Sequence, residues 1–542
     1  MKKFLSILLI STGLGIILFF IYLKFSPVTH IRSIHLVPSD AIYIIEISQP
    51  VNAWKQIQNS ELWSSLRTNP FFSEINENAQ FVDSLLKNNS TIAEIFANQP
   101  LIISAHMTEA KNYDFLCLWS MHDVATKLGS FKKWLLSFSD YQITERKYKD
   151  FIIYELRDPK ENSILYLSFI EDVLVASYTP KLIRKAIETS QKPDLSEDNR
   201  FIKIQNLIKG REYFSVYFNP RQFNSFLGIY MNDLGSLKDL HHTVDYSGFQ
   251  VLLDGKMLDL KGYVLPKDSS VSLLTAMLTS GAGKRPSQNI LSNRTAWFAS
   301  LSFEDFLQFY EEFEMQMKKN PKVYAEHVKN LSKIEKFLKI NIKKDFVSWI
   351  SQEVCLVANK PADSSFTNPE LIVYIHTNNI DNAKEKIKFI LKQVKKRTKV
   401  LKTQAYEYKG FEIYHFQVRG LFKLLFGKLF QKFDMPYVTF IEDFAIFSLD
   451  ELALQSIIDD YTEKRFLNQN IAFQNFIDRF KSQSSIFYYL HMQNFYPIFP
   501  SYVSSLTWQS IQQNEQYIKL LEQIGFEMTA ENDKFFTKLE IN

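Results

Sequence analysis

Two short stretches of this chain occur twice, and they decide the fold. Residues 148–154 read YKDFIIY and residues 408–414 read YKGFEIY, so five of seven positions are identical. Residues 169–177 read FIEDVLVAS and residues 440–448 read FIEDFAIFS, with five of nine positions identical. Because both matches keep the same order along the chain, they indicate an internal duplication rather than chance similarity between apolar strands.

Weaker matches extend the duplication along the chain. They pair residues 41–48 with 295–302, 101–104 with 355–358, 217–223 with 489–495, and 248–249 with 525–526. The offset between matched positions grows from 254 to 277 residues, as insertions in the second copy require. We therefore predict that residues 36–265 and residues 290–542 are two copies of one fold.

Each predicted copy mixes strand hairpins with helical stretches. The Glu-Asp pairs at 171–172 and 442–443 are interpreted as hairpin turns, and Asp254-Gly255 is a strong signal for another. This order favours an α+β fold with mainly antiparallel sheets over a doubly wound parallel sheet. Residues 280–287 (SGAGKRPS) have the composition of a flexible linker between the copies.

The N-terminus predicts a membrane anchor. Residues 4–23 form an apolar stretch of 20 residues behind Lys2 and Lys3, long enough as a helix to cross about 30 Å of bilayer core. A cleaved signal peptide is disfavoured, because its apolar region is shorter and ends in small residues, whereas the first alanine here is Ala41. The two lysines place the N-terminus in the cytoplasm and the rest of the chain on the periplasmic side of the inner membrane.

The resulting domain prediction has three parts. Residues 1–34 form the cytoplasmic stub, transmembrane anchor and juxtamembrane segment. Residues 35–285 form the first α+β repeat with the linker, and residues 286–542 form the second repeat. The fold class is therefore a single transmembrane helix followed by a tandem duplication of an α+β domain.

Composition and motifs exclude several function classes. The 63 Lys+Arg and 59 Asp+Glu residues leave a net charge of +4, which argues against a dedicated nucleic-acid binder. Two cysteines in 542 residues exclude a disulfide scaffold and a cysteine-rich metal centre. We find no phosphate loop, no Gly-x-Ser-x-Gly elbow and no local Ser/His/Asp arrangement, so we predict no catalytic residue, no metal and no cofactor. Four histidines near predicted strand ends are interpreted as satisfied polar residues: His106, His122, His376 and His491.

The opening strand at residues 36–43 (LVPSDAIY) and the Phe-Ile-Glu-Asp hairpins carry a resemblance. The chain resembles a family of membrane-anchored, extracytoplasmic bacterial proteins of unknown function, which carry two α+β repeats behind one N-terminal helix. This resemblance implies the same architecture here. It supplies no catalytic residue.

One segment stands out as a candidate contact surface. Residues 420–433 (GLFKLLFGKLFQKF) fall where the second copy has 11 additional residues. Projected as one helix, they separate a Phe/Leu half from a lysine-rich half, as interfacial helices do. The alternative, which we favour slightly, is that the apolar half packs on its own domain. The candidate membrane or partner contacts are Phe422, Phe426, Phe430, Phe433, Lys423, Lys428 and Lys432.

A second basic stretch, residues 384–402, holds nine Lys/Arg and one acidic residue, Glu385. Its apolar positions predict a helix with one buried face, so the basic residues are interpreted as a solvated outer face. Attraction to anionic lipid headgroups is the alternative.

These observations favour a non-enzymatic, membrane-anchored envelope protein that acts as a scaffold or binding module. The alternative is a carrier for a lipid or another apolar ligand. A filled core with an exposed apolar patch would favour the first, and an apolar cavity between sheet and helices the second. The expected partners are the membrane, through the N-terminal helix, and an envelope protein or an anionic lipid, but not nucleic acid.

Overall fold

The computed structural model divides into two compact units, which we describe separately. Those residues of 32–39, 99–103 and 115–196 that the structure describes form the first unit, and those of 40–69, 104–114 and 197–542 form the second. The structure describes residues 32–69, 99–121, 142–157, 159, 163–192, 195–210, 212–230, 240–267, 273–363, 365, 367–397 and 405–542.

The first unit is built on an antiparallel meander. Its strands, each paired with the next, are β4 (Gln142–Tyr148), β5 (Phe151–Arg157), β6 (Ile164–Ile170) and β7 (Val173–Ser177). Strand β7 also pairs with the end of β3 (Asn112–Ser120). Helix α7 (Pro180–Gln191) packs on β6 and β7 through Leu182, Ile183, Ala186 and Ile187, which lie on one helical face.

Tight turns with positive φ join corresponding strands of the two predicted copies. Lys149 and Glu171 begin the turns between β4 and β5 and between β6 and β7, with φ values of 51° and 54°. In the second unit, Lys409 and Glu442 begin the corresponding turns, with φ of 48° at both. Two-residue hairpin turns of the primed types need this left-handed backbone, because their twist matches that of the strands. The hairpins predicted at 171–172 and 442–443 are therefore confirmed.

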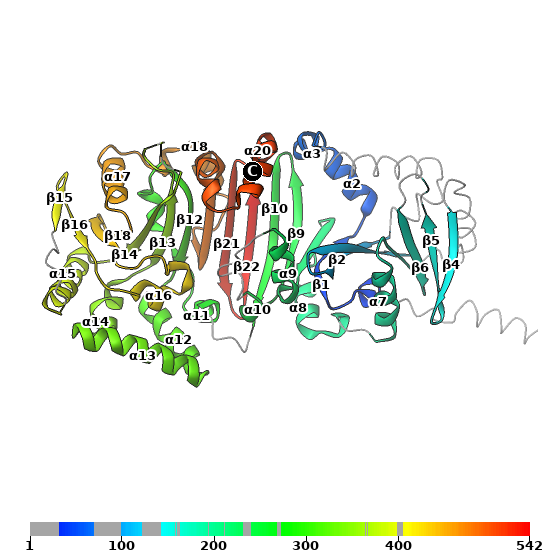
Figure 1. Cartoon of the computed structure of the whole chain (residues 1–542), viewed down its shortest axis with the longest axis horizontal. Helices are drawn as coiled ribbons and strands as arrows, with labels where there is room; N and C mark the ends of the chain where they lie inside the picture. The colour runs from blue at the N-terminus through cyan, green and yellow to red at the C-terminus, as the bar shows by residue number, and fades with distance from the viewer. Residues whose placement is uncertain are drawn as a thin grey trace, which may run out of the picture. The chain divides into compact units, whose positions relative to one another are not determined.

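The second unit contains a long, wholly antiparallel sheet. Its strands, in spatial order, are β1 (Ala41–Ile47), β8 (Phe214–Phe218), β9 (Val244–Asp254), β10 (Met257–Pro266), β22 (Lys534–Ile541), β21 (Gln523–Glu531), β20 (Ile486–His491), β12 (Thr295–Ser302), β13 (Glu353–Asn359), β14 (Glu370–His376), β18 (Phe444–Ser448), β17 (Tyr437–Ile441) and β16 (Phe411–His415). Strand β15 (Tyr406–Tyr408) pairs with β16. In the middle, β10 lies beside β22, with partners from Leu258 and Ile541 to Val264 and Phe535 (Figure 1).

The order of strand pairings is the same in both predicted copies. In the first, β1 is followed in the sheet by β8, β9 and β10, and in the second β12 is followed by β20, β21 and β22. Strand β3 is followed by β7, β6, β5 and β4, and β14 by β18, β17, β16 and β15.

Helices cover both faces of the β12–β18 part of this sheet. One face packs against α12 (Phe306–Lys318), α13 (Pro321–Leu338), α14 (Ile342–Asp345), α15 (Ile380–Arg397) and α16 (Leu421–Phe426). The other packs against α17 (Glu451–Thr462) and α18 (Ile471–Ile477). Every residue of β13 is consequently buried. Helix α15 buries Ala383, Ile387, Ile390 and Val394, which confirms the buried face predicted for the basic stretch.

The structure contains further helices and strands besides those named above. They are β2 (Leu101–Glu109), α2 (Pro50–Gln58), α3 (Glu61–Leu66), α8 (Asn199–Leu207), α9 (Pro220–Tyr230), α10 (Leu240–Thr243), α11 (Leu273–Thr279), β11 (Gly283–Lys284), β19 (Gln483–Ser484), α19 (Met492–Phe495), α20 (Ser505–Gln513) and α21 (Glu515–Ile518), with short 3₁₀ turns between them.

The predicted fold class requires correction, because it began with a transmembrane helix. Within the described ranges, no helix is both long enough and apolar enough to cross a membrane. Helices α13 and α15 reach 18 residues, but each is amphipathic and carries lysines along its exposed side. The architecture is thus a large, mostly antiparallel sheet with helices. The stretch 4–23, on which that prediction rested, lies outside the described residues.

The predicted linker at 280–287 is also not what the structure contains. Strand β11 pairs with β19, and Ser280, Arg285 and Ser287 are buried. The Arg285 guanidinium donates from Nη1 to Ser484 Oγ at 2.8 Å and from Nη2 to the Lys481 carbonyl at 2.7 Å. Glycine serves close packing here rather than flexibility, since a Cβ on Gly283 would lie 2.2 Å from the Phe303 carbonyl oxygen.

We expect Gly283→Ala to destabilise the second unit by about 1–3 kcal/mol, because the added methyl group overlaps backbone atoms that cannot rotate away. The thermal unfolding midpoint measures the effect. Gly228→Ala is the matched control, since a Cβ at this helical position meets nothing within 4 Å and alanine favours the helix. Equal midpoints for the two variants would contradict the close packing of Gly283.

Candidate functional site

The helix predicted over residues 420–433 is interrupted. Helix α16 ends at Phe426, and a short 3₁₀ turn, η7 (Lys428–Phe430), follows it. Between them, Gly427 has φ of 83° and ψ of −169°, a backbone conformation that glycine adopts readily and that ends the helix. The prediction of one continuous interfacial helix is therefore wrong, because Gly427 ends the helix in the middle of the segment.

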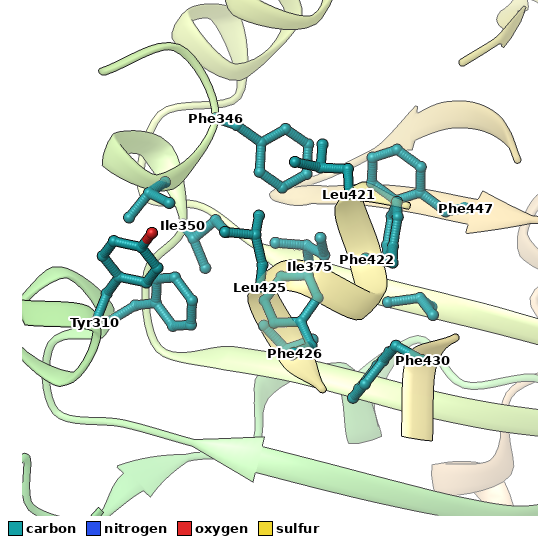
Figure 2. Close-up of a cluster of buried hydrophobic side chains, with 14 of the residues drawn as sticks. Tyr310, Phe346, Ile350, Ile375, Leu421, Phe422, Leu425, Phe426, Phe430 and Phe447 are labelled. Atoms are coloured by element: carbon teal, nitrogen blue, oxygen red, sulfur yellow. The ribbon is translucent and has the colours of Figure 1, made fainter. Parts of the chain in front are cut away.

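The phenylalanines of this segment lie in the core of the second unit. Phe422 and Phe430 are 0% exposed, Phe426 is 4% and Phe433 2%. The Phe422 ring centroid lies 5.0 Å from that of Phe447 on β18, in an edge-to-face arrangement that aromatic pairs favour. Figure 2 shows Phe422, Phe426 and Phe430 among buried side chains that include Ile375 of β14 and Phe447 of β18. The apolar side packs internally, which is the alternative that we favoured slightly.

Two lysines of the segment, Lys423 and Lys432, face solvent. The Lys428 side chain is outside what the structure describes. Lys423 lines one pocket together with α13, and Lys432 lines another beside Trp297. The segment therefore borders two different pockets while its aromatic rings hold it in the core.

Truncating this aromatic anchor should be costly. We expect Phe422→Ala to destabilise the protein by about 3–5 kcal/mol, because it removes a ring that is fully enclosed by the core. Leu429→Ala is the control in the same segment: its side chain is 47% exposed, so we expect a change within about 0.5 kcal/mol. Thermal or urea unfolding measures both, and an unchanged midpoint for Phe422→Ala would contradict internal packing.

The pocket beside Trp297 has an aromatic wall. It measures about 420 Å³ and is lined by Trp297, Leu429, Lys432, Phe433 and Tyr502 among others. The wall is held in place, because Trp297 Nε1 donates a 2.9 Å hydrogen bond to the Tyr502 hydroxyl. Partial desolvation of its hydroxyl raises the pKa of Tyr502, so the acceptor stays a neutral hydroxyl.

A second pocket, of about 510 Å³, carries carboxylates instead. Two of them are neutralised: Glu370 pairs with Arg294 at 2.7 Å, and Asp459 pairs with Lys409 at 2.7 Å. The other two accept backbone N–H groups, Asp363 that of Ser365 at 2.9 Å and Asp450 that of Leu452 at 3.0 Å. The hydrogen bonds from Ser365 lower the pKa of Asp363, which keeps this carboxylate charged.

These two pockets adjoin, since both are lined by Asn368, Pro369 and Leu371 at the start of β14. We call the pair the aromatic–acidic groove. Four large apolar side chains border it and remain exposed to solvent: Leu429 (47%), Tyr502 (43%), Leu449 (39%) and Leu452 (64%). The groove can therefore take apolar groups at one end and a positive group at the other.

Tertiary structure brings together Ser104, His106 and Asp40, which no local sequence motif indicates. His106 Nε2 lies 2.9 Å from Ser104 Oγ, and His106 Nδ1 lies 3.0 Å from Asp40 Oδ1. These are the residue types of a hydrolytic triad. However, Ser104 and His106 are both 0% exposed, so no substrate carbonyl can reach Ser104 Oγ in this conformation. Asp40 is far from the other two in sequence, which is why no local pattern indicated the contact.

The other singled-out histidines differ from expectation. His376 and His491 end strands β14 and β20 as predicted, but within the described part of the chain the Nδ1 atom of each has no hydrogen-bond partner. Burial lowers the pKa of both imidazoles. His122 lies outside the described residues.

This burial predicts a pH dependence of stability. A lowered pKa means that the unfolded chain binds protons near its ordinary value of about 6.5 while the folded chain resists them. The neutral His376 and His491 therefore do not destabilise the fold above that pH. As the pH falls through it, protonation favours the unfolded chain and the free energy of unfolding decreases. We expect the urea midpoint to fall less between about pH 7.5 and pH 5.5 in a His376→Gln/His491→Gln variant than in the native chain.

The native chain must be compared with this variant, because carboxylates with a raised pKa make the protein more stable as the pH falls, which is opposite to the effect of the histidines. Burial raises the pKa of Glu353 and Glu370, and stability from a raised carboxyl pKa is lost as the pH rises. An equal fall of the midpoint in both proteins would show that the two histidines do not resist protonation.

Comparison with known proteins gives limited overlap. The family model described as "Protein of unknown function (DUF3352)" matches residues 126–385, somewhat under half of the chain. This agrees with the resemblance to a family of unknown function, and it bears on neither the anchor nor the repeats. No curated protein matches the chain. Two solved structures, crystal forms I and III of TP0453, align over 46% of this chain and 84% and 86% of theirs, at 11% identity and TM-scores of 0.25 and 0.24.

Proposed function

We propose that this protein is a non-enzymatic binding module that takes an extended segment of a partner protein into the aromatic–acidic groove. The observation that carries the proposal is the set of exposed large apolar side chains around two adjoining pockets. Exposed apolar side chains that cluster around a concavity are typical of interaction sites. Aromatic anchors in such pockets commonly supply most of the binding energy.

The two ends of the groove favour a particular sequence in the partner. An apolar or aromatic side chain fits between Trp297, Leu429 and Tyr502. A Lys or Arg further along the segment would meet Asp363 and Asp450, which accept hydrogen bonds but form no ion pair among the described contacts. An opposite charge at a groove end gives register and specificity more than affinity.

The same charges disfavour the alternative of an apolar-ligand carrier at this place. A purely apolar ligand would cover Asp450 and Lys432 without pairing them, and burying an unpaired charge is costly. A peptide can pair both. The extracytoplasmic location and an envelope protein as partner remain predictions from the sequence.

We also propose that the two predicted copies arose by duplication, which the repeated order of strand pairings and the equivalent left-handed turns support. Leu429 and Lys432 belong to the additional residues of the second copy, where the first copy has the polar stretch 157–163. Peptide binding would thus be a property of the second copy alone.

The test is selection of peptides on the full chain. A displayed library of roughly twelve-residue peptides, about 40 Å when extended, should yield sequences that combine an apolar residue with a following Lys or Arg. Fluorescence anisotropy then measures a selected peptide on variants. We expect Leu429→Asp and Leu452→Asp to weaken binding about tenfold or more, because each places a charge at an apolar border.

Leu506→Asp is the matched control. Leu506 is 79% exposed on α20 and lines neither pocket, so the same substitution there should leave binding unchanged. The proposal is wrong if the library yields no binder, or if the selected peptides bind all three variants equally well.

A further inference from the structure

A third pocket is lined by the first residues of the segment 420–433, whose later residues border the aromatic–acidic groove. It measures about 500 Å³ and is formed by α13 and by residues around the start of α16. We call it the cationic pocket. Its lining residues are Met317, Val323, Glu326, His327, Asn330, Lys333, Ile334, Arg419, Gly420, Lys423 and Leu424.

His327 is the feature that points to a ligand. Its side chain is on α13 and the residue is only 8% exposed, yet its Nε2 atom has no hydrogen-bond partner among the residues that the structure describes. Buried polar atoms in folded proteins nearly always have a partner, so an unpaired ring nitrogen at a pocket wall is a natural contact for a bound group. In the tautomer with a proton on Nε2, this atom donates to an oxygen of that group.

The charges around His327 favour a negative group. Lys333 and Lys423 are exposed at the pocket, and neither forms an ion pair among the described contacts. Arg419 is also there, with Nε 3.3 Å from Asp434 Oδ2, while Glu326 is the acidic member of the lining. Positions 326, 327, 330 and 333 lie on one side of α13, because residues three and four apart are neighbours on a helix.

The rest of the pocket is apolar. Met317, Val323, Ile334 and Leu424 line it beside the cations, and Met317 is buried. A bare inorganic ion would leave most of this space without contacts. A ligand that combines an anionic head with a short apolar body would use both parts of the lining.

We propose that the cationic pocket binds a small amphiphilic anion, a phosphate ester or carboxylate carrying an alkyl or aryl group, whose anionic oxygens contact His327, Lys333 and Lys423. This site is separate from the aromatic–acidic groove and does not depend on peptide binding there. The same phosphate chemistry occurs in a soluble ester and in a lipid headgroup.

Hexyl phosphate is the probe, titrated calorimetrically into the full chain, with inorganic phosphate and hexanol as reference ligands. We expect hexyl phosphate to bind at least about tenfold more tightly than either reference, because only it matches both parts of the lining. Inorganic phosphate binding equally well, or no binding of hexyl phosphate, would overturn the proposal.

Variants locate the site. Lys333→Glu should reduce hexyl phosphate affinity about tenfold, whereas Lys336→Glu, the same charge change on an exposed part of α13 outside the pocket, should have little effect. His327→Leu should reduce affinity similarly without lowering the unfolding midpoint, since it removes an unpaired buried nitrogen. If His327→Leu does not fold, the two lysine variants decide, and equal affinities for them would overturn the assignment.

A competition experiment identifies the source of the anion. Vesicles of phosphatidylcholine with phosphatidic acid are added to the complex with hexyl phosphate, and phosphatidylcholine vesicles alone are the control. Displacement by the anionic vesicles only would identify a lipid headgroup as the ligand. Binding that these vesicles leave unchanged would identify a soluble amphiphile.

Discussion

The pairing of β10 with β22 is the constraint on which the second unit depends. Seven consecutive residue pairs join the two strands, and the strand order from β1 to β16 passes through them. On β22, Lys538 and Glu540 are buried and form an ion pair, with Nζ and Oε2 2.6 Å apart. Arg479 Nη1 contacts the other carboxylate oxygen of Glu540 at 2.7 Å. A shift of one residue in the register would turn the Lys538 and Glu540 side chains to the opposite face of the sheet and leave their charges unpaired. This network therefore specifies the register.

The parts of the fold that depend on neighbouring residues could be predicted from the sequence. Hairpin turns at 171–172 and 442–443 follow from two residues between apolar strands, and the buried face of α15 follows from its periodicity. The break at Gly427 could not be predicted in this way. A projection at 100° per residue assigns glycine to a face but does not ask whether its backbone is helical.

Features that depend on residues far apart in the chain could not be predicted from local sequence patterns. The aromatic–acidic groove brings together Trp297, Leu429, Leu452 and Tyr502, which are separated by up to about two hundred residues. The composition of 280–287 resembles a linker because glycine serves both flexible chains and tight contacts, and only the nearby Phe303 backbone distinguishes the two. The Asp40–His106 contact likewise arises from tertiary structure alone.

A single short segment connects the core to both proposed binding regions. Its phenylalanines fill the core beside Phe346 and Phe447, while Leu429 and Lys432 border the groove and Lys423 borders the cationic pocket. Because the core holds this backbone in place, its outward side chains are pre-organised, and little ordering is required when a ligand arrives. An insertion that began as added length can acquire contact surfaces in this way without disturbing the sheet.

The pairing of β10 with β22 also has a consequence during synthesis. The paired residues are 271 to 283 positions apart, from Val264 with Phe535 to Leu258 with Ile541. At about 5–20 residues per second, β10 leaves the ribosome roughly 15–55 s before its partner strand exists. For that interval β10 is an open sheet edge with unpaired backbone groups, which can recruit a strand from another nascent chain. A chaperone that shields this edge would therefore act on the first half of the chain, even though the missing strand belongs to the second.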